Sequence, residues 1–483
     1  KVVTAQEPGG SGDIYEGLNE DQKQALKEAT SMGFPPKAWF DYPYMGDGAL
    51  MVLVPAVYQM FPTYFKDFWE KEGYEGADPE SNEARAHMKL VTTVEHLDYD
   101  YAEPELSEEE KNTVDTSWLN TILGGEKLPH IYLKDAIPAD TYTYHCRFKV
   151  LDGACAGKEI NISSIDGNML ELHPENDGKH ENPFKELKPG DQVMIDNGDA
   201  IAMQCFHRHQ LPDETYDVYD QFRNEDGSPK YTQLPMLVAP MTAISGAGLM
   251  PTGNIHGKVI GICSMMDESA CPWHGDWYRK AIGRCGIDEQ DHFRLYYHDN
   301  SIHDDRAGYL DDPQNQVDYL GTLHQALLDV AAWCEKGIEP FDTMNYTYAD
   351  GQITLPKGAK ERGGMQPVVS AVVENAAGQS DYDGKVTRAK VGENICFKAV
   401  IEVPPKAGKV THAAWDYEKT NDWSNDEVIE AVDDTTYKIE ADHVFTKPGI
   451  YYPVIKVASN RHGDAGDIFT QCKNLDRVKV IVE

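Results

Sequence analysis

The chain has few basic residues and no long apolar segment. It contains 44 Lys and Arg residues against 81 Asp and Glu residues, a formal net charge of −37 over 483 residues. Binding to a polyanion needs clusters of Lys and Arg, so this balance argues against a nucleic-acid partner and against an anionic membrane surface. The longest apolar stretch, residues 49–57, has the length of a core segment. The sequence therefore predicts no membrane span.

Cysteine is also scarce, and its spacing matches no metal-binding pattern. The nine cysteines form no CxxC pair, so we predict no structural zinc site and no cofactor. Two pairs, Cys146 with Cys155 and Cys271 with Cys285, are close enough along the chain to form disulfides. His207 and His209 are two residues apart, a spacing that does not share a helical face, so we predict no metal site there either.

The N-terminal residues 1–137 are predicted to be mainly helical. Only residues 48–55, with the sequence GALMVLVP, have the composition of a strand. A capping residue, acidic first turns and strong helix formers predict helices over the following segments: 19–31, 58–72 with a break at Pro62, 81–97, and 106–123, where Ser107 and Glu110 have capping-box spacing.

Three further regions differ in their hydrophobic period. Residues 138–200 alternate and contain Asp-Gly and Pro-Gly turns, which predicts a small β-barrel-like insert. Residues 201–356 contain continuous apolar runs at 234–240, 256–267 and 292–299, with helical spacing between the last two and a long helix over 317–337. This order predicts parallel βαβ units. Residues 365–483 have a period of two, and their six expected strands predict an immunoglobulin-like sandwich.

Two residues in the predicted βαβ region have the placement of a proton relay. Asp267 ends the GKVIGICSMM strand, and His303 follows the FRLYYHDN strand 36 residues later. A carboxylate in this position orients an imidazole and stabilises its protonated form, while the other ring nitrogen takes a proton from a nucleophile. The alternative is an ordinary helix cap at Asp267 and a solvated loop histidine at His303. His298 is a rival histidine, although it lies within the strand.

These segments resemble the last third of an α/β-hydrolase, in which the acid follows one strand and the histidine follows the next. The β-insert ending DNGDAIAMQCFHRHQ, the block GKVIGICSMMDESACPWHGDWYR and the junction ERGGMQPVV extend the resemblance over most of the chain. They are similar to secreted α/β-hydrolase-like proteins of the tannase and feruloyl-esterase type, which often carry a C-terminal PKD-like domain. The resemblance implies secretion or a cell-envelope location, and it implies that residues 1–137 form a helical region or lid.

The sequence departs from that family at the nucleophile. The family places serine in a GxSxG elbow after an early strand, and no GxSxG is present. Ser245, in AISGAG, follows an apolar run but has different neighbours. The chain begins at Lys1 without a signal-like segment, so we expect a processed chain. Two hypotheses follow: the serine and the first strands lie upstream of Lys1 or on a partner chain, or the catalytic machinery has been lost.

The C-terminal region resembles a PKD domain. The resemblance rests on Trp415-Asp416 and on the segment DHVFTKPGIYYPVIKVAS. It implies that Trp415 packs in the sandwich core, and we expect Pro448-Gly449 to form a hairpin turn. The nearby carboxylates of Asp416, Asp422 and Asp426 provide the oxygen ligands that Ca²⁺ prefers, so calcium is the one ion to test here.

The sequence thus leads to two alternatives for function. The first is a serine-type α/β-hydrolase that acts on the ester bond of a small-molecule or polymer substrate, with Asp267 and His303 serving a serine from outside the chain. The second is a catalytically inactive hydrolase-like protein that binds a ligand or assembles at the cell surface. The acidic charge disfavours polyanionic substrates.

Overall fold

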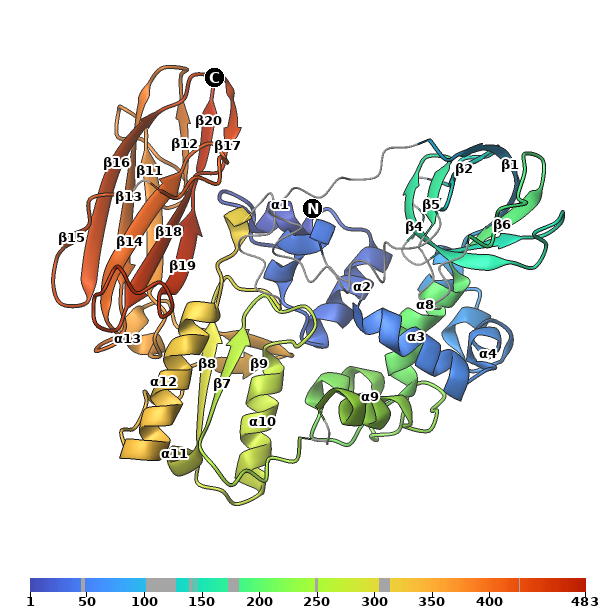
Figure 1. Ribbon diagram of the computed structural model, residues 1–483, viewed down its shortest axis with the longest axis horizontal. Coiled ribbons are helices and arrows are strands. Elements are labelled where there is room, and N and C mark those ends of the chain that lie inside the picture. Colours follow the sequence, from blue (N-terminus) through green and yellow to red (C-terminus); the bar gives the residue numbers. More distant parts are fainter. Residues whose placement is uncertain are drawn as a thin grey trace. The chain divides into compact units, whose positions relative to one another are not determined.

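The protein is a mixed α/β chain, shown as a computed structural model in Figure 1. The structure describes residues 1–44, 48–100, 127–138, 141, 143, 146–172, 182–247, 251–303, 313–424 and 426–483. Two compact units are present: the first comprises residues 1–47, 213–221 and 247–483, and the second comprises residues 48–212 and 222–246. Within the described residues, no helix is both long enough and apolar enough to cross a bilayer.

A closed antiparallel barrel of six strands forms one part of the second unit (Figure 1). Its strands pair in the order β1-β2-β5-β4-β3-β6. Alternate side chains point inward, as Phe148 and Val150 of β3 and Val193 and Ile195 of β6 show. The strands are β1 (Lys89–Asp98), β2 (His130–Leu133), β3 (Arg147–Val150), β4 (Glu159–Asp166), β5 (Met169–Leu172) and β6 (Gln192–Asp196).

The barrel was expected, but it begins before residue 138. The helix predicted over 81–97 is wrong: only α5 (Asn82–Ala86) is helical, capped by the Ser81 side chain, and β1 follows at Lys89. Residues 89–98 are rich in β-branched residues, and Thr92 and Val94 are buried. Pairing with β2 and β6 therefore outweighs the helix-forming residues that precede the strand. The helix predicted over 106–123 lies outside the described residues.

Outside the barrel, the regular elements described in the second unit are helices. Its helices are α3 (Gly48–Met60), α4 (Tyr64–Glu70), η2 (Glu75–Ala77), α8 (Gly198–Cys205), η3 (Phe206–His209) and α9 (Val238–Ala247). The break at Pro62 separates α3 from α4, as predicted. Residues 48–55 and 238–240 were expected to be strands and are helical, because a short apolar run does not distinguish a buried strand from a buried helix. Tyr64, Phe65 and Phe68 pack in the core between these helices.

The first unit begins with helices and contains one βαβ unit. The N-terminal elements are α1 (Val2–Gln6), α2 (Glu20–Ser31) and η1 (Pro36–Tyr44), and Asn19 and Gln22 form the capping box of α2. The βαβ unit consists of β7 (Val259–Ser264), α10 (Trp273–Arg284), α11 (Glu289–His292) and β8 (Phe293–His298), followed by α12 (Leu320–Lys336). As predicted, α12 ends at Gly337 in the left-handed conformation.

The parallel sheet is smaller than a hydrolase sheet. Strands β7 and β8 pair in parallel from Val259 with Phe293 to Ser264 with His298. Among the described residues no further strand joins them, so the expectation of a larger parallel hydrolase sheet within this chain is wrong for that part of it. The remaining small elements are η4 (Asp217–Phe222), η5 (Pro313–Asn315), the hairpin β9 (Thr347–Ala349) with β10 (Gln352–Thr354), and α13 (Ala359–Arg362).

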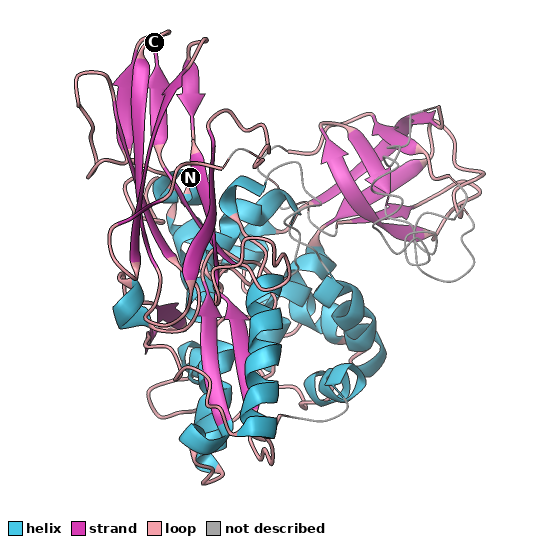
Figure 2. Cartoon of the chain, turned by 60° about the vertical axis from the view of Figure 1, so that its left-hand side comes forward, coloured by secondary structure: helices cyan, strands magenta, loops and turns pink. Residues whose placement is uncertain are grey.

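The C-terminal residues form three small sheets around a shared core (Figure 2). The sheets are β11-β13-β16-β15, β12-β20-β17 and β14-β18-β19. Trp415 of β14 is buried in this core, as expected. The strands are β11 (Val368–Glu374), β12 (Val386–Ala389), β13 (Asn394–Glu402), β14 (Lys409–Asp416), β15 (Glu430–Ala431), β16 (Thr436–Val444), β17 (Gly449–Tyr451), β18 (Val454–Asn460), β19 (Cys472–Arg477) and β20 (Lys479–Val482).

Three local predictions need correction. Pro448-Gly449 is not a hairpin turn, because β16 pairs with β13 and β15, whereas β17 pairs with β20. The chain thus changes sheet at this point. The disulfide considered between Cys271 and Cys285 is not formed, nor is the one between Cys146 and Cys155 in the barrel, and none of the nine cysteines is in a disulfide.

Candidate active site

Asp267 lies just beyond the carboxyl end of β7, in a loop that is fixed by backbone hydrogen bonds. The amides of Ser269 and Ala270 donate to its Oδ1 over 2.9 and 2.6 Å. These bonds are those of an Asx turn, which sets the direction of the carboxylate before α10 begins. The residue is 7% exposed. Asp267 is therefore a buried and oriented carboxylate, rather than a simple solvated turn residue.

His303 follows β8 and meets that carboxylate. Its Nδ1 lies 3.1 Å from both Oδ1 and Oδ2 of Asp267. The imidazole side chain is 46% exposed, whereas the carboxylate side chain is 10% exposed. The two residues predicted from the sequence are thus brought together by the parallel pairing of their strands. With Nδ1 held by the carboxylate, Nε2 is the nitrogen that exchanges a proton with a reacting group.

The two loops that carry the pair are tied to each other. Beyond the last paired residues, the Met265 amide donates to the His298 carbonyl and the Met266 amide donates to the Ser301 carbonyl, each over 2.9 Å. The Ser301 hydroxyl donates to the same His298 carbonyl over 3.0 Å. The hydroxyl of Tyr319 donates to the His303 carbonyl over 3.2 Å. These bonds continue the β-ladder into the loops and hold the Asp267 and His303 backbones in register.

Three ionisable groups near Asp267 stay neutral at pH 7. Burial, with a smaller contribution from the Asp267 charge, raises the pKa of the Cys263 thiol to about 12 and that of the Cys271 thiol to about 12. Neither thiol is therefore an activated nucleophile. Burial lowers the pKa of His274, at the start of α10, and the Asp267 carboxylate opposes that shift. Sequence reasoning did not select His274, although it lies in the same WHGDWYR segment as the predicted helix.

The rival histidine, His298, occupies a different environment. It is the last residue of β8 and is 1% exposed. Gln366 Nε2 lies 3.2 Å from its Nδ1 and 3.3 Å from its Nε2. Burial lowers the pKa of His298 to about 4, although the charges of Asp318 and Asp299 oppose the shift. A neutral, enclosed imidazole of this kind is a packing residue in the core, so His303 is the better candidate for proton transfer.

The serine candidates within the chain do not have the geometry of a nucleophile elbow. Ser245 lies inside helix α9, not at a turn between a strand and a helix, so the idea that it follows a strand is wrong. Ser264 and Ser301 are buried, at 8% and 0% exposure. The described residues therefore bring a carboxylate and an imidazole into contact, but Ser245, Ser264 and Ser301 do not lie in an elbow that would present a serine to them.

The predicted metal candidates do not converge on a site. Among the described residues, no group of three or more His, Cys, Asp and Glu side chains is arranged to hold a metal ion. The carboxylate of Asp416 accepts the backbone amides of Thr420 and Asn421, whereas Asp422 accepts from Ser424 and Asp426 contacts His412. The three carboxylates thus serve separate local hydrogen bonds, and the calcium hypothesis receives no support from their arrangement.

Comparisons with known proteins add no evidence to this geometry. No model of a known protein family matches the chain, and a search of the curated proteins finds no similar sequence.

Proposed function

We propose that the protein is a serine-type α/β-hydrolase that cleaves an ester bond, and that Asp267 and His303 are two members of its catalytic triad. The contact of 3.1 Å between the His303 Nδ1 and the Asp267 carboxylate carries this proposal. The order strand, acid, helix, strand, histidine, helix is the order of the last third of an α/β-hydrolase. The C-terminal sheets would then be an immunoglobulin-like domain of the PKD type, supported by the buried Trp415.

A serine from polypeptide outside residues 1–483, either upstream in a longer precursor or on a partner chain, would complete the site. The exposure of β7 supports this part of the proposal. Every residue of β8 is buried, whereas Val259 to Cys263 of β7 are each partly exposed despite the apolar sequence VIGIC. Strands of a parallel sheet are normally covered on both faces, and an apolar strand at an edge invites pairing. A further strand beside β7 would bring a nucleophile elbow to the same edge of the sheet.

The chemistry at that edge follows from the contact between the carboxylate and the imidazole. The serine Oγ attacks the ester carbonyl carbon as its proton passes to His303 Nε2, and the Asp267 carboxylate stabilises the resulting imidazolium. The carbon–oxygen bond to the alcohol then breaks, and the alcohol leaves with the proton from Nε2. Water repeats the sequence on the acyl-enzyme and releases the acid. The acidic character of the chain favours neutral or cationic ester substrates, and a secreted or envelope-located protein fits the proposal.

The test uses the protein isolated from its native source under conditions that preserve complexes. We expect a fluorophosphonate probe to label one serine, and mass spectrometry to place that serine on polypeptide outside residues 1–483. We expect Asp267→Asn to lower kcat on p-nitrophenyl esters by about 10⁴, as the corresponding change does in serine proteases, because the imidazole then adopts the wrong tautomer.

Asp291→Asn is the matched control, since Asp291 is exposed and lies on α11, away from the loops of the dyad. It removes the same charge and should leave kcat unchanged. If no serine is labelled on this chain or on any co-purifying chain, the hydrolase proposal is wrong. The Asp267–His303 pair would then be a remnant in a protein that binds a ligand or assembles at a surface.

A further inference from the structure

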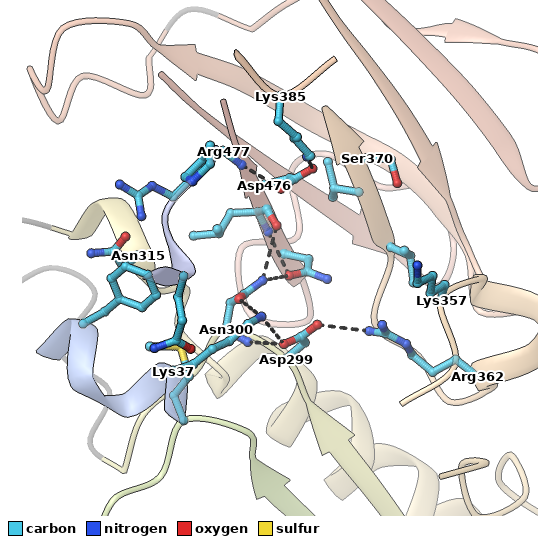
Figure 3. Close-up of a pocket in the computed structure, with 18 residues that line it drawn as sticks. Lys37, Asp299, Asn300, Asn315, Lys357, Arg362, Ser370, Lys385, Asp476 and Arg477 are labelled. Atoms are coloured by element: carbon cyan, nitrogen blue, oxygen red, sulfur yellow. Dashed lines mark hydrogen bonds and ion pairs between the residues drawn. The ribbon is translucent and has the colours of Figure 1, made fainter. Parts of the chain in front are cut away.

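A cavity of about 400 Å³ in the first unit is lined by an unusual proportion of basic residues (Figure 3). It lies where the carboxyl end of β8, the N-terminal η1 helix, the α13 region and strands β11 and β19 meet. The volume is within the range of roughly 300–1,000 Å³ that small-molecule sites occupy. We call it the basic pocket. Its charged lining residues are Lys37, Lys357, Arg362, Lys385, Arg477, Asp299 and Asp476.

The charge of the basic pocket is opposite to that of the chain. Five basic and two acidic side chains line it, a formal excess of three positive charges in a protein with a net charge of −37. Glu7, which pairs with Arg477 over 2.9 Å but does not line the cavity, reduces the excess to two. A recess lined by one sign of charge between low-dielectric walls concentrates counter-ions of the other sign. Because the chain is acidic, its surface outside the pocket repels anions, so an anion would bind preferentially in the basic pocket.

Two of the cations share one carboxylate. Lys37 and Arg362 approach the Asp299 carboxylate from two sides, over 3.3 and 3.4 Å (Figure 3). Arg362 is only 6% exposed, and its Nε donates to the Pro356 carbonyl over 3.1 Å. Burial by itself would raise the pKa of Asp299, but the two cations outweigh burial and lower it to about 2. One carboxylate therefore neutralises one of two ordered cations, and the second positive charge remains.

The remaining cations differ in their partners. Lys385 pairs with Asp476, and Figure 3 shows this pair on the sandwich side of the cavity. Lys357 is exposed and forms no ion pair among the described residues. Apolar side chains complete the walls, among them Phe40, Met266 and Val369. The pocket thus combines separated positive charges with apolar surface, an arrangement that fits a carbon skeleton carrying more than one carboxylate better than it fits a bare inorganic anion.

We propose that the basic pocket binds a small organic polycarboxylate. Its carboxylates would lie against Lys37, Arg362 and Lys357, and its carbon skeleton would lie against the apolar wall. The proposal does not depend on the hydrolase function, because it uses neither Asp267 nor His303.

The test is isothermal titration calorimetry of the full chain with citrate, tricarballylate and inorganic phosphate, at low and constant ionic strength. We expect citrate and tricarballylate to bind with affinities within about threefold of each other, because the shared skeleton and carboxylates make the contacts. We expect phosphate to bind at least about tenfold more weakly, since it lacks the carbon skeleton. Raising the ionic strength from 20 to 150 mM should weaken citrate binding severalfold, because salt screens the attraction.

Two lysine variants separate the pocket from a general charge effect. Lys357→Gln should weaken citrate binding by about threefold to tenfold, the effect of losing one charged contact. Lys360→Gln is the matched control: Lys360 is exposed, lies three residues further along the chain and does not line the cavity, so citrate binding should not change. Arg362→Lys retains the charge but loses the planar fork, and it should also weaken binding.

Three outcomes would overturn the proposal. One is undetectable citrate binding at 10 mM citrate and low salt. Another is an equal loss of affinity in Lys357→Gln and Lys360→Gln, which would indicate non-specific attraction. The third is tighter binding of phosphate than of citrate, which would show that the carbon skeleton contributes nothing.

Discussion

The buried imidazole of His298 makes the stability of the first unit depend on pH in a defined range. Its pKa is lowered to about 4 by burial, whereas a histidine in the unfolded chain titrates near 6.5. Between these values the unfolded chain binds a proton that the folded chain does not bind. Falling pH therefore favours unfolding, and the stabilising contribution of the neutral imidazole is complete only above the unfolded pKa.

The magnitude follows from the two pKa values. Linkage gives a loss of about 2 kcal/mol in the free energy of unfolding between pH 7 and pH 5 from this one residue. Protonation would place a charge inside the core next to Gln366 Nε2. That amide nitrogen is a donor that already donates to the carbonyls of Asp299 and Lys473 over 2.9 and 2.8 Å, so it cannot accept a proton from the imidazolium.

The measurement is urea denaturation at pH 7 and pH 5, with hydrogen exchange of the β7 and β8 amides to follow this part of the chain. His298→Gln removes the titrating group, so the difference between the two pH values should shrink by about 2 kcal/mol relative to the unmodified protein, whatever the variant does to stability at pH 7. His256→Gln changes an exposed histidine and should leave the difference unaltered. An equal pH dependence in His298→Gln and the unmodified protein would refute the reasoning.

Two further predictions concern stability. Gly321→Ala should destabilise the first unit by about 1–3 kcal/mol or more, because a Cβ would lie 1.9 Å from the Gln471 carbonyl oxygen. Gly283→Ala should stabilise α10 by up to about 1 kcal/mol, because a Cβ there would have no other atom within 4 Å. Thermal unfolding of both variants checks these opposite signs. Asp416→Ala should cost about 1–3 kcal/mol, because the buried Gln314 side chain and the backbone amides of Thr420 and Asn421 all lose the carboxylate that accepts from them. The same change at exposed Asp422 should cost less than about 0.5 kcal/mol in urea denaturation.

Local chemistry explains which parts of the fold were predictable. The capping residue at Asn19, the break at Pro62 and the C-terminal glycine of α12 were predicted correctly, because each acts over a few neighbouring residues. The alternating segments of the C-terminal region were predictable for the same reason, but the six expected strands are ten in the described residues, because the segments 449–459 and 476–483 each divide between two sheets and the short strands β12 and β15 were not expected. By contrast, residues 48–55 and 238–240 became helices, because a uniformly apolar run has no period to distinguish the two structures. Tertiary context decided those segments.

Longer-range pairing explains the remaining errors. The segment at 89–98 belongs to the barrel because its partners, β2 and β6, lie about 40 and 100 residues away along the chain. Pro448-Gly449 has the composition of a hairpin turn, yet the strands on its two sides join different sheets. Neither the barrel partners of 89–98 nor the change of sheet at Pro448-Gly449 can be predicted from the local sequence. A turn-forming sequence shows that the chain bends, but it does not show which strand the chain meets next.

The contrast between the dyad and the basic pocket follows from the same rule. Asp267 and His303 were found from the sequence because the carboxyl ends of adjacent parallel strands meet at one edge, so that strand order alone places the acid beside the histidine. Asp299 lies at that same edge, directly after β8, but its partners come from η1 and α13. No pattern in the sequence connects Lys37 with Arg362, which are more than 300 residues apart. A site whose parts follow consecutive strands is therefore accessible to sequence reasoning, whereas a site assembled from distant elements appears only once the chain is folded.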